Sequence, residues 1–199
     1  MQNFTKPVLG FAAYSGAGKT TLLEKLLPLM KLQGLRVAMI KQTHHDFDID
    51  KPGKDSYRLR KAGAQQMLIA SDRRCALMTE FDQPRDHELS DLIARLDLDD
   101  IDLILVEGFR HLPFPKIELH RPSTGKPQIF PSEDSVIAVA TDDAMDTGSL
   151  PMLNLNVPEE VMGFINRWLE SRSRVGLPTD CLLYTSPSPR DQLQHLVCR

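Results

Sequence analysis

Residues 13–20 have the sequence A-Y-S-G-A-G-K-T, and the rest of the chain is organised around this stretch. It matches the phosphate-binding loop pattern G-x-x-x-x-G-K-[ST] everywhere except the first position, where Ala13 replaces glycine. An apolar run at residues 8–12 predicts a buried strand before the loop. Leucines at helical spacing over residues 21–30 predict an amphipathic helix after it. The motif therefore lies in the strand–loop–helix context that phosphate binding requires.

Each residue of this loop suits a part of that chemistry. The glycines let the backbone turn so that its N–H groups point at an anion, and the following helix N-terminus favours negative charge. The lysine can reach the outer phosphates of a nucleoside triphosphate, and the first threonine hydroxyl can bind Mg²⁺. A chance glycine-rich turn is the alternative. The predicted nucleotide-binding residues here are Ser15, Gly16, Ala17, Gly18, Lys19, Thr20 and Thr21.

Length and composition narrow the class of protein. A chain of 199 residues suits one domain with a sizeable core, and its net charge of −3 does not suggest a nucleic-acid-binding surface. No apolar run approaches the roughly 20 residues of a membrane span, and the N-terminus does not resemble a signal peptide. The three cysteines have no paired spacing, which favours reduced thiols. We therefore expect a cytoplasmic protein.

A second predicted strand, residues 36–41, leads into the polar stretch K-Q-T-H-H-D-F-D-I-D-K-P-G-K-D-S at residues 41–56. Three hypotheses fit it: a solvated loop, a switch-like loop near the γ-phosphate and Mg²⁺, or a transition-metal site at His44, His45 and Asp46. The switch-like hypothesis makes His44 a nucleotide contact. It makes Asp46 and Asp50 the weaker candidates for the metal environment.

A third apolar strand, residues 101–108, ends in Glu107 and a glycine. Proteins with this phosphate-binding loop place an acidic group at the end of a second strand, near the metal or its water shell. Glu107 is our candidate for that role, whereas Asp102 lies at the wrong end of the strand. A strand that ends in Glu-Gly by chance is the alternative.

An acidic pair follows a further apolar strand, at residues 135–140. A carboxylate suits the N1–H and N2–H₂ donors of guanine, which adenine does not offer together. We predict that Asp142 binds the base, with Asp143 as the next choice. A helix or turn cap is an equally good interpretation of the same residues.

The remaining pattern predicts an α/β fold with three layers and a mostly parallel sheet. Two apolar runs, residues 66–70 and 75–79, predict an antiparallel hairpin at the sheet edge. Beyond residue 171 the sequence loses its periodicity and gains prolines, so we expect a nucleotide-binding domain at 1–171 and an irregular tail at 172–199. A read-through or non-native end is one interpretation of this tail, and a partner-binding segment is the other. Further elements are predicted at 56–63 and 86–96 (helices), 116–120 (strand) and 158–169 (helix).

Four segments together resemble the MobB family of molybdopterin-guanine dinucleotide biosynthesis adapter proteins. They are F-A-A-Y-S-G-A-G-K-T-T (11–21), K-Q-T-H-H-D-F-D-I-D-K-P-G-K-D-S (41–56), R-K-A-G-A (60–64) and D-L-I-L-V-E-G-F (102–109). The resemblance extends from about residue 8 to residue 169 and excludes the tail. The middle segment is far more specific than a phosphate-binding loop alone.

This resemblance implies a dimeric GTP-binding protein with the P-loop fold and at most weak GTPase activity. Such proteins assist the partner enzyme, a guanylyltransferase, that joins GMP to molybdopterin. Slow turnover is expected because no free-standing arginine finger is evident, with Arg110 as the exception to consider. Three rivals share the fold: an ATP-dependent small-molecule kinase or ligase, a metallochaperone GTPase that uses His44 and His45, and a scaffold with a vestigial loop.

Overall fold

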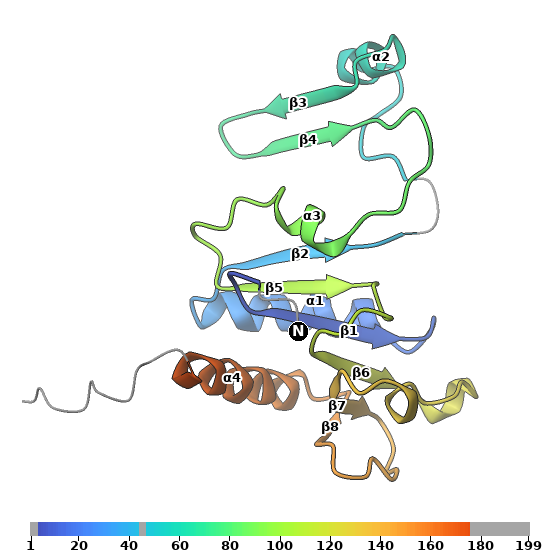
Figure 1. Ribbon diagram of the computed structural model, residues 1–199, viewed down its shortest axis with the longest axis vertical. Coiled ribbons are helices and arrows are strands. Elements are labelled where there is room, and N and C mark those ends of the chain that lie inside the picture. The colour runs from blue at the N-terminus through green and yellow to red at the C-terminus, as the bar shows by residue number, and fades with distance from the viewer. Residues whose placement is uncertain (1–3, 44–46, 176–199) are drawn as a thin grey trace, which may run out of the picture. The chain divides into compact units, whose positions relative to one another are not determined.

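The computed structural model describes residues 4–43 and 47–175, and side chains as far as residue 172 (Figure 1). Strands and helices alternate along the chain. In chain order the elements are β1 (Val8–Ala13), α1 (Lys19–Leu32), β2 (Val37–Lys41), α2 (Asp55–Lys61), β3 (Gln66–Ala70), β4 (Cys75–Thr79), α3 (Leu89–Ile93), β5 (Leu103–Glu107), β6 (Lys116–His120), β7 (Val136–Thr141), β8 (Met152–Asn154) and α4 (Pro158–Val175), with short 3₁₀ turns at Pro122–Thr124 and Phe130–Ser132.

Six strands form one sheet in the order β2-β5-β1-β6-β7-β8, and every neighbouring pair is parallel. The first strand lies between β5 and β6, so that Phe11 is opposite Glu107 on one side and Ile117 on the other. Because the strands are parallel, the loops that follow β1, β2, β5, β6, β7 and β8 all leave from the same edge of the sheet. This edge is where open α/β sheets bind ligands.

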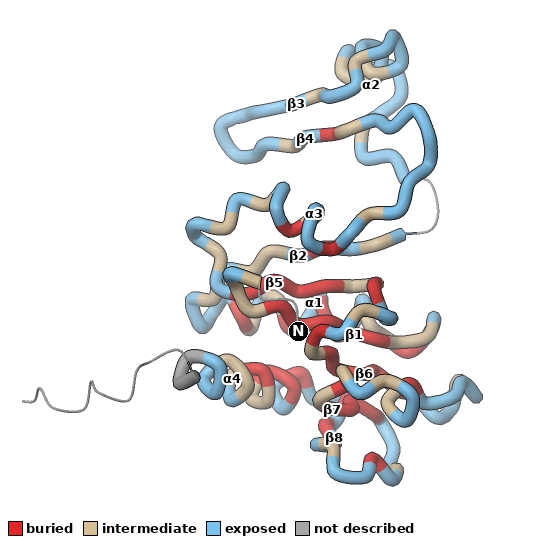
Figure 2. The backbone as a smooth tube through the Cα atoms, viewed as in Figure 1, coloured by how far each residue is buried: buried red, intermediate tan, exposed pale blue. Residues whose placement is uncertain are grey.

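Both faces of the sheet are buried along its central strands β5, β1, β6 and β7, which explains the continuous apolar runs of β1, β5 and β7 (Figure 2). On one face Val8, Ile104 and Val106 form a cluster with Leu89 and Ile93 of α3. The opposite face carries fully buried leucines of the same strands, and α1 buries one apolar side of its own. The three-layer α/β fold with a mostly parallel sheet is therefore confirmed. The buried residues on that opposite face of the sheet are Leu9, Leu103 and Leu105, and those of α1 are Leu22, Leu23, Leu26 and Met30.

The predicted hairpin also forms, with β3 and β4 paired antiparallel and Leu68 opposite Leu77. It is a two-stranded sheet of its own, however, and not an edge of the six-stranded sheet. The difference arises because the main sheet ends at β2 and β8, neither of which pairs with the hairpin. Both edges of the hairpin thus lack a strand partner among the residues that the structure describes.

Three elements differ from the prediction in length or existence. The helix expected at 86–96 is only α3, because Glu88 is extended and, beyond Ile93, Leu96 donates to the carbonyl three residues before it. The three-residue strand β8 was not predicted, since it carries only one buried residue, Leu153. The last helix continues past the expected end to Val175. No described helix is long and apolar enough to cross a membrane.

Candidate nucleotide-binding site

The loop at residues 13–20 has the backbone that an anion cradle requires. Gly16 and Gly18 have φ angles of 87° and 90°, in the left-handed region that favours glycine. Gly18 is the N-cap of α1 and provides no side-chain cap, so no side chain of the cap residue occupies the N–H groups of the first turn. Ala13 is an ordinary residue of β1, which explains why a methyl group is accepted at the position of the usual glycine.

Glu107 ends β5 beside this loop and lies between two ammonium groups. Its Oε1 is 3.3 Å from Nζ of Lys19, and its Oε2 is 3.4 Å from Nζ of Lys41. Only 13% of the Glu107 side chain is exposed, against 20% for Lys19. The structure therefore brings the predicted phosphate-binding lysine and the predicted metal carboxylate together. It adds Lys41, which the sequence analysis did not assign although it ends a strand at the ligand-binding edge.

Gln42 shapes the turn that presents Glu107. The N–H of Gln42 donates to the carbonyl of Glu107 at 2.8 Å, and its Oε1 accepts from the N–H of Phe109 at 3.0 Å. The turn passes through φ angles of 106° at Gly108 and 51° at Phe109. A Cβ on Gly108 would lie 2.6 Å from Cβ of Gln42, so glycine is required here by both conformation and space. The Glu-Gly ending of this strand is thus part of the site's construction.

Asp142 follows β7 at the same edge of the sheet and pairs with Arg121, which follows β6. The Arg121 guanidinium also donates to the carbonyl of Ala17 at 3.2 Å and to Oδ1 of Asn156 at 3.0 Å. Asp143 instead makes a contact within its own exposed loop, where its Oδ1 accepts from the N–H of Ala144 at 2.8 Å. Arg121 and Asn156 were missed by the sequence analysis. Their positions just after β6 and β8 are the signal that could have found them.

Asp50 belongs to a different cluster. Its carboxylate accepts from Oγ of Ser56 at 2.9 Å and from Nε of Arg60 at 3.4 Å, and its side chain is 7% exposed. Arg60 also pairs with Asp48 and Glu80, and its hydrogen bond to Glu80 raises its pKa. Among the described residues, Asp50 contacts none of the groups around Lys19. These contacts tie the loop to α2, and Arg60 extends them to Glu80, the residue after β4. A role of Asp50 in the metal environment stays a prediction.

Three predicted residues, His44, His45 and Asp46, lie outside the described residues. The transition-metal hypothesis that rests on them is therefore not addressed by the geometry. Within the described ranges, no group of three or more His, Cys, Asp or Glu side chains could hold a metal ion.

Arg110 lies with its guanidinium carbon 5.4 Å from the centre of the Tyr14 ring. Tyr14 is the second residue of the phosphate-binding stretch, so Arg110 is a cation beside the loop. This contact keeps Arg110 as a candidate for stabilising charge on a bound phosphate.

A phosphate-binding loop between a central parallel strand and a helix, with an acidic strand end beside it, defines a P-loop nucleotide-binding protein of the α/β class. Within this class the chain belongs to the MobB family. The family model described as "Molybdopterin guanine dinucleotide synthesis protein B" matches residues 8–142.

Relatives and solved structures agree with this assignment. The chain is 46% identical over 168 residues to the molybdopterin-guanine dinucleotide biosynthesis adapter protein of Escherichia coli K12, covering 84% of this chain and 95% of the relative. It is 44% identical over 164 residues to that of Haemophilus influenzae, covering 82% and 89%. A crystal structure of molybdopterin-guanine biosynthesis protein B has a TM-score of 0.63 at 26% identity, covering 82% of this chain and 99% of that one. The MobB homologue of Bacillus stearothermophilus shares the fold, with a TM-score of 0.61 at 22% identity and coverage of 83% and 99%.

Proposed function

We propose that this protein binds GTP with Mg²⁺ and acts as an adapter in the synthesis of molybdopterin guanine dinucleotide. The observation that carries the proposal is the meeting of Lys19, Glu107 and the uncapped N-terminus of α1 at one edge of the sheet. This arrangement supplies the donors and the charge that a triphosphate needs. The adapter role comes from the MobB relatives, whose names describe it.

The donor set also fits a magnesium ion. Mg²⁺ prefers oxygen ligands, and the site offers the Glu107 carboxylate, with the Thr20 hydroxyl at the start of α1. Bound there, the ion would neutralise charge on the phosphate oxygens. Two lysines already pair with Glu107, so the protein alone is a poor cation site. We expect Mg²⁺ to bind well only with the nucleotide, whose phosphates attract both lysines away from the carboxylate.

Binding of guanine is proposed at Asp142, and any hydrolysis of GTP is proposed to be slow. A carboxylate accepts from both N1–H and N2–H₂ of guanine, and this selects guanine over adenine. Arg110 beside Tyr14 is the candidate for supplying positive charge during phosphoryl transfer. An ATP-dependent kinase or ligase on the same fold would instead prefer ATP and turn over only with its second substrate.

One titration tests the nucleotide proposal. GTP, ATP and molybdopterin are titrated by calorimetry against the purified protein, with and without Mg²⁺, and again with Lys19→Ala. We expect GTP to bind more tightly than ATP, Mg²⁺ to strengthen GTP binding, and Lys19→Ala to weaken it by at least tenfold, about 1.4 kcal/mol. Equal GTP affinity in Lys19→Ala would contradict the assignment. Stoichiometric Ni²⁺ or Zn²⁺ binding that His44→Ala abolishes would favour the metallochaperone instead.

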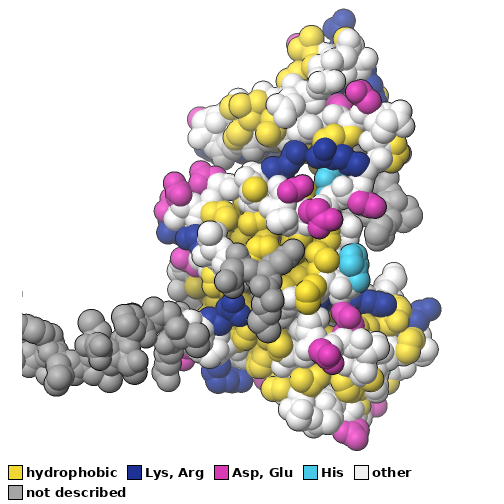
Figure 3. All heavy atoms as spheres, in the orientation of Figure 1, with side chains coloured by type: hydrophobic (Ala, Val, Ile, Leu, Met, Phe, Trp, Pro, Cys, Tyr) yellow, Lys and Arg dark blue, Asp and Glu magenta, His cyan; other side chains and the backbone are white. Residues whose placement is uncertain are grey.

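A homodimer built through the hairpin is the second part of the proposal. Leu68 and Leu77 face each other across β3 and β4, yet they are 62% and 55% exposed. Figure 3 shows hydrophobic side chains gathered over this hairpin, and an isolated two-stranded sheet with open edges is only marginally stable. A second copy of the chain would cover these side chains and pair the edges.

The mass of the protein in solution tests the dimer. We expect light scattering to give twice the chain mass for the wild type and the single-chain mass for the double variant Leu68→Glu, Leu77→Glu. Arg73→Glu, an exposed change in the connection between the two strands, is the matched control and should stay dimeric. A monomeric wild type would exclude the proposal.

The partner enzyme and the location complete the proposed function. An adapter implies an enzyme partner, and we propose a guanylyltransferase that joins GMP to molybdopterin. The protein bound to GTP should then be retained by the immobilised enzyme, and Lys19→Ala should be retained less. We propose the cytoplasm as the location, because an exposed free thiol such as Cys75 is usual there.

A further inference from the structure

Arg121 joins four segments that are distant in the sequence. It directly follows β6, and its guanidinium donates through Nε to Ala17 in the phosphate-binding loop. It donates through Nη2 to Asn156, which follows β8, and pairs through Nη1 with Asp142, which follows β7. Since β1, β6, β7 and β8 are neighbours in the sheet, one side chain spans four consecutive strand ends at the ligand-binding edge. Only 28% of the Arg121 side chain is exposed.

At the phosphate end, Arg121 sets the direction of one peptide group. The carbonyl of Ala17 and the N–H of Gly18 belong to the same planar trans peptide, so they point in opposite directions. Because Arg121 holds the carbonyl, the N–H of Gly18 is turned away from Arg121. A Cβ on Gly18 would lie 3.5 Å from Nε of Arg121, so the guanidinium packs directly behind the loop. The arginine thereby holds open the anion-binding conformation of the loop.

At the other end, Arg121 orients two side chains of opposite hydrogen-bonding character. Asp142 is held through Oδ2, and a carboxylate has about four acceptor sites, so it keeps the capacity to accept further hydrogen bonds. Asn156 accepts from Arg121 through Oδ1, which directs its NH₂ group elsewhere as a donor. Arg121 therefore fixes which end of the Asn156 amide is presented.

This pair of groups complements guanine. The Watson–Crick edge of guanine offers one acceptor, O6, and two donors, N1–H and N2–H₂, which match an amide donor and a carboxylate acceptor. Adenine offers a donor at N6 and an acceptor at N1, which is the reverse order. The other described partner of the Arg121 guanidinium, the carbonyl of Ala17, lacks this complementarity.

We infer that Arg121 is a positioning residue that couples the phosphate loop to a base-recognition pair, Asp142 and Asn156, with Asn156 as an unassigned determinant of guanine specificity. The inference rests on the proposed binding of GTP. It adds to that proposal Asn156 as the donor to guanine O6, and Arg121 as the residue that positions the phosphate loop and the base-recognition pair relative to each other.

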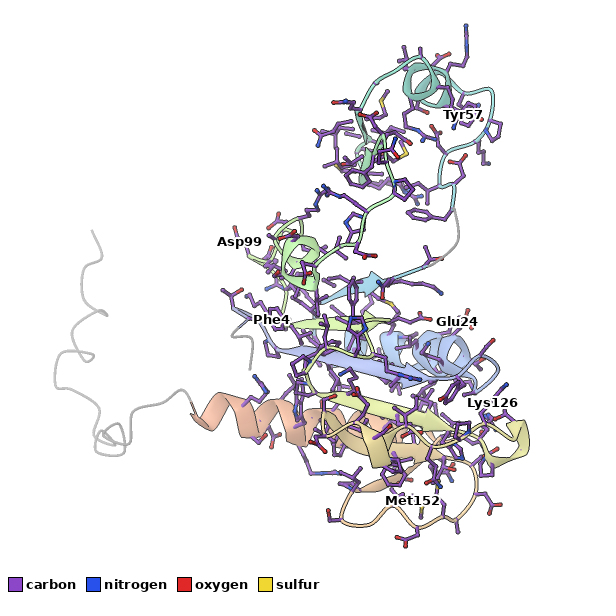
Figure 4. The ribbon with its side chains drawn as sticks, turned by 45° about the vertical axis from the view of Figure 1, so that its right-hand side comes forward. Phe4, Glu24, Tyr57, Asp99, Lys126 and Met152 are labelled. Carbon is purple, nitrogen blue, oxygen red and sulfur yellow. The ribbon has the colours of Figure 1, made fainter. Side chains whose placement is uncertain are left out.

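The test measures affinity for GTP, ATP and inorganic tripolyphosphate in the wild type and in Arg121→Gln, Arg121→Lys and Asn156→Ala. Asn156→Ala should lower the ratio of GTP to ATP affinity by about tenfold, the effect of one lost hydrogen bond to the base, and leave tripolyphosphate binding unchanged. Arg121→Gln should lower that ratio and also weaken tripolyphosphate binding. Arg121→Lys should recover only part of the wild-type affinity ratio and of the wild-type affinity for tripolyphosphate, because one ammonium group cannot reproduce the planar set of guanidinium donors. Lys126→Gln, an exposed change in the loop after β6 (Figure 4), is the control and should match the wild type.

The outcomes separate this inference from the proposed function. A wild type that binds no nucleotide overturns both. A wild type that prefers GTP, with Arg121→Gln and Asn156→Ala keeping the wild-type ratio, overturns the inference alone. Weaker binding of all ligands by the same factor in Arg121→Gln would show a purely structural role and would also overturn it. Circular dichroism melting of each variant confirms that the fold is intact.

Discussion

Glu107 shows how one residue serves two states of a site. Its carboxylate lies between the ammonium groups of Lys19 and Lys41, so two opposite charges flank a side chain that is only 13% exposed. In the proposed complex the phosphates take over the lysines, and the carboxylate turns to Mg²⁺. Glu107 would therefore repel the phosphates when Mg²⁺ is absent and attract the complex when it is present.

This dual role predicts that Glu107→Gln weakens the binding of GTP when Mg²⁺ is present but does not weaken it when Mg²⁺ is absent. In the presence of Mg²⁺ the variant should bind GTP about tenfold more weakly or worse, because a charged metal ligand is lost. In EDTA it should bind GTP as tightly as the wild type or more tightly, because a negative charge near the phosphates is gone. Calorimetry under both conditions measures this. Asp102→Asn, at the opposite end of the same strand, should change neither value, and a Glu107→Gln variant that keeps the full Mg²⁺ effect would contradict the assignment.

At the scale of the element, β6 carries two buried charged side chains, Lys116 and Glu118, which an apolar strand pattern does not predict. Lys116 is 1% exposed, and its ammonium donates to the carbonyl of Phe114 at 3.1 Å and to Oγ of Ser135 at 2.7 Å. Burial lowers the pKa of Lys116, and the nearby Glu133 opposes this shift. Glu118, fully buried, accepts from the N–H groups of Ile129 at 2.8 Å and Phe130 at 2.7 Å. The charged side chains of β6 thus hold the segments around Phe114 and Ser135 through Lys116, and the segment at Ile129 and Phe130 through Glu118.

Glu118→Gln should be costly for stability. The amide supplies one oxygen where the structure needs two, and it places an NH₂ donor against a backbone N–H donor, which leaves a buried group unsatisfied. We expect the free energy of unfolding to fall by roughly 1–3 kcal/mol, measured by urea denaturation. Glu24→Gln on the exposed side of α1 (Figure 4) is the matched control, and equal stability of the two variants would show that the paired contacts of Glu118 contribute nothing.

At the scale of the whole molecule, the described side chains that are buried or lie in the candidate site all come from the chain before residue 170. The Escherichia coli relative matches this chain over 95% of its own length but over only 84% of this chain's length. The last helix ends at Val175. Residues 1–171 remain our proposal for the nucleotide-binding domain, with the remainder as a tail.

A protein that ends at residue 175 should therefore keep its stability and its ligand. We expect its melting temperature to stay within about 2 °C of the full chain, equivalent to roughly 0.5 kcal/mol, with the same affinity for GTP. Differential scanning calorimetry with and without GTP measures both. A loss of GTP binding on truncation would show that the segment after 175 takes part in the site.

The sequence by itself determined the class of fold and predicted the phosphate-binding half of the candidate site. Local patterns are sufficient there, because the loop of residues 13–20, its glycines and its flanking strand and helix are contiguous in the chain. It also indicated Glu107, because a strand that ends in an acidic residue and glycine is again a local pattern.

Only the tertiary structure decided the rest. Parallel strands bring their carboxyl ends to one edge of the sheet, and this places Arg121, Asn156 and Lys41 in the candidate site. No single segment of the sequence predicts the order of the strands. Tertiary contacts also place Asp50 in the cluster around Arg60, which includes Glu80, the residue directly after β4. The physical reason is that a contact between residues far apart in sequence depends on which strands pair, and pairing is settled by the packing of the whole sheet.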